Sequence, residues 1–123
     1  MDAQPSFDHA QIRRYYDRHT SGFMTLGTGG TEGVIHRAVW GPGVTSAAGA
    51  FHYVDDRIAD SIGNLGPRLH ILDLGCGVGA TLCHLARRLD ARATGVTLSP
   101  VQARLATSRI EAEGLADLSL IHI

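Results

Sequence analysis

The spacing of apolar residues from position 71 onward predicts strands that alternate with helices. Residues 71–74 form an apolar run broken only by one aspartate, and we expect a buried strand there. The helical spacing i, i+3, i+4 and i+7 follows at Leu82, Leu85, Ala86 and Leu89. A strand over residues 92–98, a helix that begins near residue 99 and a strand over residues 118–123 complete the pattern. The predicted unit is β-α-β-α-β, half of a doubly wound α/β sheet.

The part of the chain before this unit predicts two helices. The first covers residues 8–19, with one face formed by Ile12, Tyr15, Tyr16 and His19. Residues 21–31 are rich in glycine and threonine and predict a loop. The second helix covers residues 47–64, with one face formed by Phe51, Val54, Ile58 and Ile62. A glycine-proline pair then breaks the pattern, so we divide the chain into an N-terminal helical cap, residues 1–66, and a nucleotide-binding unit, residues 67–123.

Three glycines at alternate positions follow the first predicted strand of that unit. The segment is Asp73-Leu74-Gly75-Cys76-Gly77-Val78-Gly79. Glycine lets the chain turn tightly and leaves the backbone bare for a ligand to approach. A strand, a glycine turn and a helix N-terminus in this order predict a nucleotide site.

One interpretation of the turn is a nicotinamide dinucleotide site, because residues 75–80 fit G-x-G-x-x-A. Two details count against it. Asp73 would lie close to a pyrophosphate and repel it. The end of the second strand should carry an acid for a ribose or an arginine for a 2′-phosphate, and it carries Thr97.

The turn resembles the nucleotide-binding motif of class I S-adenosylmethionine-dependent methyltransferases, in which an acid precedes glycines at alternate positions. That resemblance implies a Rossmann-like fold and S-adenosyl-L-methionine as cofactor. The cofactor carries a sulfonium and an ammonium, so a nearby carboxylate favours its binding. The residues that the resemblance assigns to the cofactor here are Asp73, Gly75, Cys76, Gly77 and Gly79.

The second strand resembles that of methyltransferases acting on sterols, tocopherols and unsaturated (cyclopropane-forming) fatty acyl chains. In that group, hydroxyl and amide side chains replace the usual ribose-binding acid. The resemblance places Thr97, Leu98, Ser99 and Gln102 at the adenosine pocket. A capping box that satisfies amide groups at the helix start explains Ser99 and Gln102 equally well, and strand propensity alone explains Thr97.

The N-terminal cap resembles that of the same group at a tyrosine-rich helix and at an I-H-x-x-x-W segment. By this resemblance Tyr16 and His36 contact the cofactor. Residues 37–39 depart from the pattern, because relatives often carry a second histidine, a glycine and an aromatic residue there. Core packing is the alternative for Tyr16, and a purely structural role is the alternative for His36.

Composition narrows the remaining classes. A chain of 123 residues with 44% hydrophobic residues and a net charge of -1 predicts at most one soluble domain, without stable membrane insertion. All eleven basic residues are arginine, which excludes lysine Schiff-base chemistry, and no basic face predicts a nucleic-acid partner. Cys76 and Cys83 are too few for a disulfide framework, and no secretory signal is visible. We therefore expect a cytoplasmic protein with no metal site.

The implied reaction is direct displacement of the cofactor's methyl group by an atom of a small, lipid-like or isoprenoid substrate. No general base can be assigned, so the catalytic residues stay unknown. The resemblance stops at the third predicted strand, where the family's sheet continues. We therefore expect an incomplete fold, that is, the N-terminal fragment of a longer enzyme. An inactive truncated fragment is the further alternative.

Overall fold

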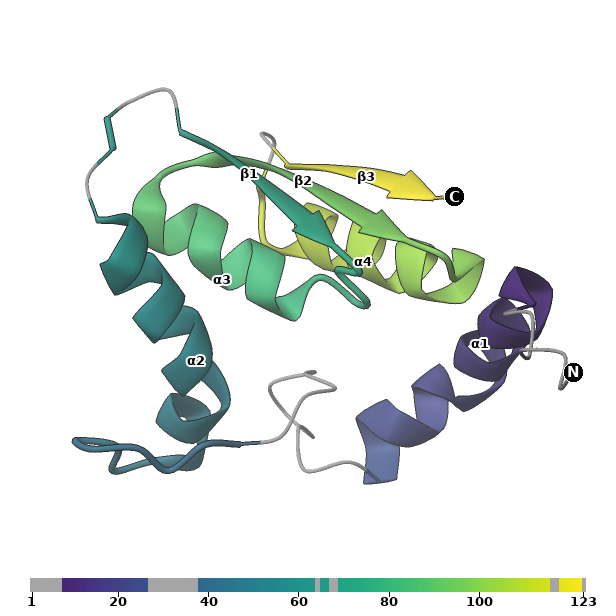
Figure 1. The fold of residues 1–123 in the computed structure, drawn as a ribbon, viewed down its shortest axis with the longest axis horizontal. Coiled ribbons are helices and arrows are strands. Elements are labelled where there is room, and N and C mark those ends of the chain that lie inside the picture. The colour runs from purple at the N-terminus through teal and green to yellow at the C-terminus, as the bar shows by residue number, and fades with distance from the viewer. Residues whose placement is uncertain (1–7, 27–37, 64, 67–68, 116–117, 123) are drawn as a thin grey trace, which may run out of the picture.

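The computed structural model describes residues 8–26, 38–63, 65–66, 69–115 and 118–122. Its elements are α1 (His9–Leu26), α2 (Ala47–Ile62), β1 (His70–Leu74), α3 (Ala80–Leu89), β2 (Arg92–Thr97), α4 (Pro100–Ala112) and β3 (Leu118–His122). Two helices therefore precede a β-α-β-α-β unit, which confirms the predicted α/β, Rossmann-like fold (Figure 1). The expected division of the chain at residue 66 stays a prediction.

The three strands are parallel and lie in the order β1-β2-β3. Both crossover helices, α3 and α4, cover the same face of this sheet (Figure 1). Right-handed crossovers that step in one direction across a sheet require this arrangement. On the opposite face, Leu72 and Leu74 are 61% and 75% exposed, and no helix of the described ranges covers them.

The core between the sheet and α3 follows the predicted apolar spacing. Leu82 and Ala86 are buried against Ala93 of β2, and Ile71 of β1 packs on the same cluster. Gly95 admits the close approach of this layer to β2. A Cβ atom at Gly95 would lie 2.7 Å from the Cys76 Sγ atom and 2.9 Å from Leu82 Cδ2.

Helix α2 begins at a Ser46 cap, whose side chain accepts a hydrogen bond from the Gly49 amide, and packs beside α3 (Figure 1). The face that it buries differs from the predicted one. Phe51 is buried as expected, whereas Val54 and Ile58 are 46% and 40% exposed. The other buried residues of α2 are Ala50, Asp55 and Ala59. The apolar spacing misidentified this face because the buried side includes two small alanines and Asp55, which pairs with Thr81 of α3.

Helix α1 continues to Leu26, so the predicted loop is wrong for residues 21–26. Local composition favoured a loop, but a tertiary contact overrides it. Thr20 is completely buried and its hydroxyl accepts a hydrogen bond from Gln102 of α4 (3.1 Å). Thr20 lies in the helical turn before Gly22, and α1 continues past Gly22 to Leu26.

None of the helices in the described ranges combines the length and the apolar character needed to cross a membrane.

We expect Gly95→Ala to lower the free energy of unfolding by about 1–3 kcal/mol, because the new methyl group overlaps Cys76 and Leu82. Urea unfolding of variant and wild type measures the difference. Gly22→Ala is the matched control, because a Cβ atom at this helical position meets no atom within 4 Å. It should raise the free energy of unfolding by about 0.5–1 kcal/mol. Equal stability of Gly95→Ala and wild type would show that the packing of Cys76 and Leu82 on β2 does not require a glycine at position 95.

Candidate functional site

The glycine turn lies between β1 and α3 and is fixed to the end of β2. The amides of Gly75 and Cys76 both donate to the Val96 carbonyl oxygen, at 2.8 and 2.9 Å. All three glycines have positive φ angles of 83°, 55° and 79° at Gly75, Gly77 and Gly79, which L side chains rarely adopt. A Cβ atom at Gly75 would meet nothing within 4 Å, so the backbone there faces open space.

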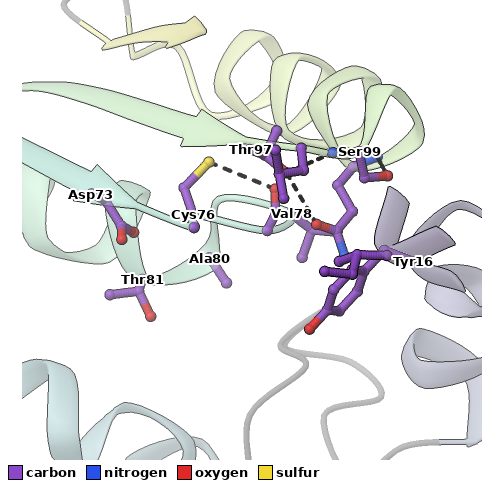
Figure 2. Close-up of a pocket in the computed structure, with 13 residues that line it drawn as sticks. Tyr16, Asp73, Cys76, Val78, Ala80, Thr81, Thr97 and Ser99 are labelled. Carbon is purple, nitrogen blue, oxygen red and sulfur yellow. Dashed lines mark hydrogen bonds between the residues drawn. The ribbon is translucent and has the colours of Figure 1, made fainter. Parts of the chain in front are cut away.

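An open cleft of about 610 Å³ lies over this turn, at the carboxyl ends of β1 and β2. Ligands of parallel α/β sheets bind at this edge, and pockets of this size hold small molecules. Figure 2 shows Asp73 and Thr81 at one end of the cleft and Tyr16 and Ser99 at the other. The residues that line it are Ile12, Tyr16, Asp73, Gly75, Cys76, Gly77, Val78, Ala80, Thr81, Thr97, Leu98, Ser99 and Gln102.

Hydroxyl and amide groups form the wall between β2 and α4. The Ser99 hydroxyl accepts a hydrogen bond from the backbone amide of Gln102 (3.1 Å) and so caps α4. The Gln102 side chain does not complete a capping box. Its Oε1 atom accepts from the Thr97 hydroxyl (3.2 Å), and its Nε2 atom donates to Thr20 of α1 (3.1 Å). The Thr97 hydroxyl also accepts from the Ser99 amide (3.2 Å).

This wall holds α1 against the cleft. Besides the contact to Thr20, the Ser99 hydroxyl donates to the Asp17 carboxylate of α1. Tyr16, next to Asp17, then lines the cleft and is 39% exposed. The Ser99 hydroxyl therefore caps α4, as one of the two predictions had it, and Ser99 also lines the cleft; its contact with a cofactor stays a prediction.

The opposite end of the cleft is acidic. Burial raises the pKa of Asp73 above its usual 3.8, and the neighbouring Asp55 carboxylate of α2 raises it further. The Asp73 carboxylate makes no hydrogen bond or ion pair with another described residue. The nearby Thr81 hydroxyl donates to Asp55 (2.9 Å). An ionised carboxylate in this half-buried place has a net attraction for a cationic ligand.

The two cysteines are free and buried. Burial raises the pKa of Cys76 to about 11, with a contribution from Asp73. Burial also raises the pKa of Cys83 to about 11, and the Glu113 carboxylate is the second largest cause. Both groups are therefore thiols at neutral pH, and Cys76 acts as a small apolar part of the cleft lining rather than as a nucleophile.

The model of the mycolic acid cyclopropane synthetase family matches residues 53–123, more than half of the chain. The chain belongs to this family. The matched range runs from within α2 to β3 and so includes the glycine turn and the wall at Thr97.

Among the curated proteins, this chain is similar to norajmaline N-methyltransferase of Rauvolfia serpentina. It is 32% identical over 91 residues, which cover 68% of this chain and 31% of the relative. The chain thus spans about a third of the length of this curated relative.

Several solved structures share the fold. The [4+2]-cyclase SpnF is 26% identical with a TM-score of 0.75, and the match covers 92% of this chain and 42% of SpnF. An S-adenosylmethionine-dependent methyltransferase from Thiobacillus denitrificans, solved with S-adenosyl-L-homocysteine, is 33% identical with a TM-score of 0.50. That match covers 56% of this chain and 28% of the other.

The structure brings most of the predicted site residues together around the cleft. Those that line it are Tyr16, Asp73, Gly75, Cys76, Gly77, Thr97, Leu98, Ser99 and Gln102. Gly79 is not among the lining residues. A Cβ atom there would lie 3.1 Å from the Ala106 Cβ atom, so Gly79 permits α3 to begin close to α4. His36 lies outside the described residues. That these residues contact a cofactor stays a prediction.

Sequence reasoning missed the lining residues Ile12, Val78, Ala80 and Thr81, and it missed Asp55 behind Thr81. Thr81 carries a weak signal, because a polar residue near the start of a helix after a glycine turn faces the site. Asp55 carries none, because its partner lies 26 positions away in the sequence.

We expect Asp73→Asn to stabilise the unliganded protein at neutral pH. The raised pKa means that the native state binds the Asp73 proton more tightly than the unfolded chain does, so ionisation above pH 3.8 costs stability. The variant should therefore unfold at higher urea than wild type at pH 7, and the difference should shrink as the pH falls toward 3.8. A difference independent of pH would contradict the assignment.

Gln102→Leu should loosen α1, because the Thr20 and Thr97 hydroxyls each lose a buried partner. A cost of about 1–3 kcal/mol in the free energy of unfolding is expected, together with faster proteolysis within α1. Thr107→Val, on the exposed side of the same helix, is the control and should change stability by less than about 0.5 kcal/mol. Unchanged proteolysis of α1 in Gln102→Leu would argue against this contact.

Proposed function

We propose that this chain binds S-adenosyl-L-methionine in the cleft above the glycine turn and serves the transfer of its methyl group to a small substrate. The observation that carries the proposal is Asp73, a half-buried carboxylate without a cationic partner among the described residues, beside a bare glycine backbone. A phosphate-bearing nucleotide would be repelled at this place, whereas a cationic one is attracted.

The residues present fit this cofactor. The open space over Gly75 leaves room for a ligand against the main chain, and the cleft volume of about 610 Å³ is sufficient for a nucleoside with an amino-acid side arm. We infer that the cationic arm lies at the Asp73 end and the adenosine at the Thr97–Gln102 end. The hydroxyl and amide groups of that wall, together with Tyr16, would hold the adenosine.

When bound, S-adenosyl-L-methionine supplies a methyl group on a positively charged sulfur, which is already an activated leaving group. The protein therefore has to orient the two reactants and exclude water. Tyr16 and Ile12 of α1 line one side of the cleft and Val78 and Ala80 line another, so apolar surface borders the place where a methyl acceptor would approach. No described residue is assigned as a general base.

The acceptor that we propose is a lipid-like or isoprenoid molecule, in keeping with the family's name and with this apolar lining. Norajmaline N-methyltransferase is named for a nitrogen acceptor, so the acceptor atom is left open. The nicotinamide alternative finds no support in the comparisons described above. Two free, buried thiols favour a reducing compartment, and we infer a cytoplasmic protein.

Binding of the cofactor product is directly measurable. S-adenosyl-L-homocysteine at about 100 times its dissociation constant should stabilise the protein by about 2.7 kcal/mol and raise the melting temperature by several degrees. NAD at the same concentration should leave it unchanged. A shift with NAD and none with S-adenosyl-L-homocysteine would overturn the proposal.

The reaction needs a second measurement, because SpnF shows that this fold also serves a cyclase. The chain should be incubated with S-adenosyl-L-methionine carrying an isotope-labelled methyl group and with unsaturated fatty acyl or isoprenoid acceptors. Label in the acceptor fraction is the expected outcome. Cofactor binding without labelled product from any acceptor would separate the binding proposal from the transfer proposal.

A further inference from the structure

Asp55 of α2 is a buried carboxylate that touches the cleft lining from behind. Asp55 is only 3% exposed. One oxygen accepts from the Thr81 hydroxyl (2.9 Å), and Thr81 lines the cleft at its acidic end. The other oxygen lies 3.0 Å from His52 Nδ1. These contacts hold the carboxylate in one position behind Thr81.

The neighbouring Asp56 makes a different set of contacts, although it also joins α2 to α3. It pairs with His84 Nε2 (2.7 Å) and with Arg88 (3.3 Å). It is 37% exposed at its side chain and does not reach the cleft lining. Two consecutive carboxylates of α2 therefore make separate contacts with α3, Asp55 with the cleft-lining Thr81 and Asp56 with His84 and Arg88.

Within the described residues, charged or titratable groups of at least three elements lie near Asp55. His52 of α2 pairs with it, and the His52 ring stacks on His84 of α3 at a centroid distance of 4.0 Å. From β1, Asp73 lies close enough to Asp55 for the Asp55 carboxylate to raise the pKa of Asp73. The Asp55 carboxylate therefore adds to the negative potential that acts on Asp73 at this end of the cleft.

We propose that Asp55 is a positioning residue that makes the cleft prefer the positively charged methyl-donor cofactor over its demethylated, uncharged-sulfur product. The inference rests on the proposed function and extends it from cofactor binding to discrimination between cofactor and product. Asp55 does not touch the ligand; it acts through its charge, which Thr81 holds in place.

The argument is one of charge. S-adenosylmethionine and S-adenosylhomocysteine have nearly the same shape and differ by one methyl group and one positive charge. A fixed carboxylate behind the cleft lining attracts the sulfonium form and has little effect on the thioether. As a general scale, two unit charges about 10 Å apart at an effective dielectric constant of about 20 interact strongly enough to change an affinity by about tenfold.

Asp55→Asn keeps the shape of the side chain and an oxygen for the Thr81 hydroxyl while it removes the charge. Calorimetric titration of the full chain with each of the two ligands gives the ratio of their affinities. We expect Asp55→Asn to lower the preference for S-adenosylmethionine by about tenfold at neutral pH. Asp56→Asn removes a neighbouring charge from the same helix turn and should change the ratio by less than about twofold.

The pH profile provides a readout that a purely structural role would not move. In the wild type, the preference for the cationic ligand should rise with pH as Asp73 ionises, over a range above its usual pKa of 3.8. Because the Asp55 charge raises the pKa of Asp73, Asp55→Asn should shift this rise to lower pH. A ratio that is flat with pH in the wild type overturns the inference, and a rise that Asp55→Asn leaves at the same pH assigns the effect to Asp73 alone and also overturns it.

The outcomes separate the two proposals. An unchanged affinity ratio in a folded Asp55→Asn variant, or an equal loss in Asp56→Asn, overturns the role of Asp55 and leaves cofactor binding intact. If the wild type binds neither ligand, the proposed function fails and this inference fails with it. A tenfold loss confined to Asp55→Asn, with the shifted pH profile, supports both.

Discussion

The Val96 carbonyl oxygen accepts hydrogen bonds from two consecutive amides, those of Gly75 and Cys76, and the site depends on this contact. It ties the end of β1 to the end of β2, one residue before β2 itself ends at Thr97. The approach is possible only because Gly95 lacks a side chain where Cys76 and Leu82 pack. Once the turn is fixed, α3 can start at its far side, and the cleft opens between the starts of α3 and α4.

Polar contacts attach both N-terminal helices to this framework, and α2 also packs Phe51 against Ala80 of α3. Thr20 of α1 binds Gln102, and Asp17 binds Ser99. On the other side, Asp55 of α2 binds Thr81, while Asp56 pairs with His84. Hydrogen bonds are directional, and leaving a buried donor or acceptor unpaired is costly, so such contacts specify where a helix lies more narrowly than apolar burial does. The side walls of the cleft therefore have defined positions.

The elements next to the glycine turn were predictable from the sequence because their signals are local. The apolar run of β1, the glycines and the helical spacing from Leu82 lie within one stretch of chain, and the resemblance that they carry led to most of the cleft lining. The length of α1 and the buried face of α2 were not predictable. They depend on Thr20 meeting a residue 82 positions away and on Asp55 meeting one 26 positions away, and neither pairing leaves a periodic pattern.

The floor of the cleft at Gly75 and Gly77 consists of main-chain atoms, and this has a consequence for variation among proteins that share it. Peptide groups have the same chemistry in every sequence, so the floor offers the same surface as long as both positions remain glycine. The side walls are made of side chains from α1, α3, the end of β2 and the start of α4. Ligand preference can therefore diverge through the walls, residue by residue, while the floor stays the same.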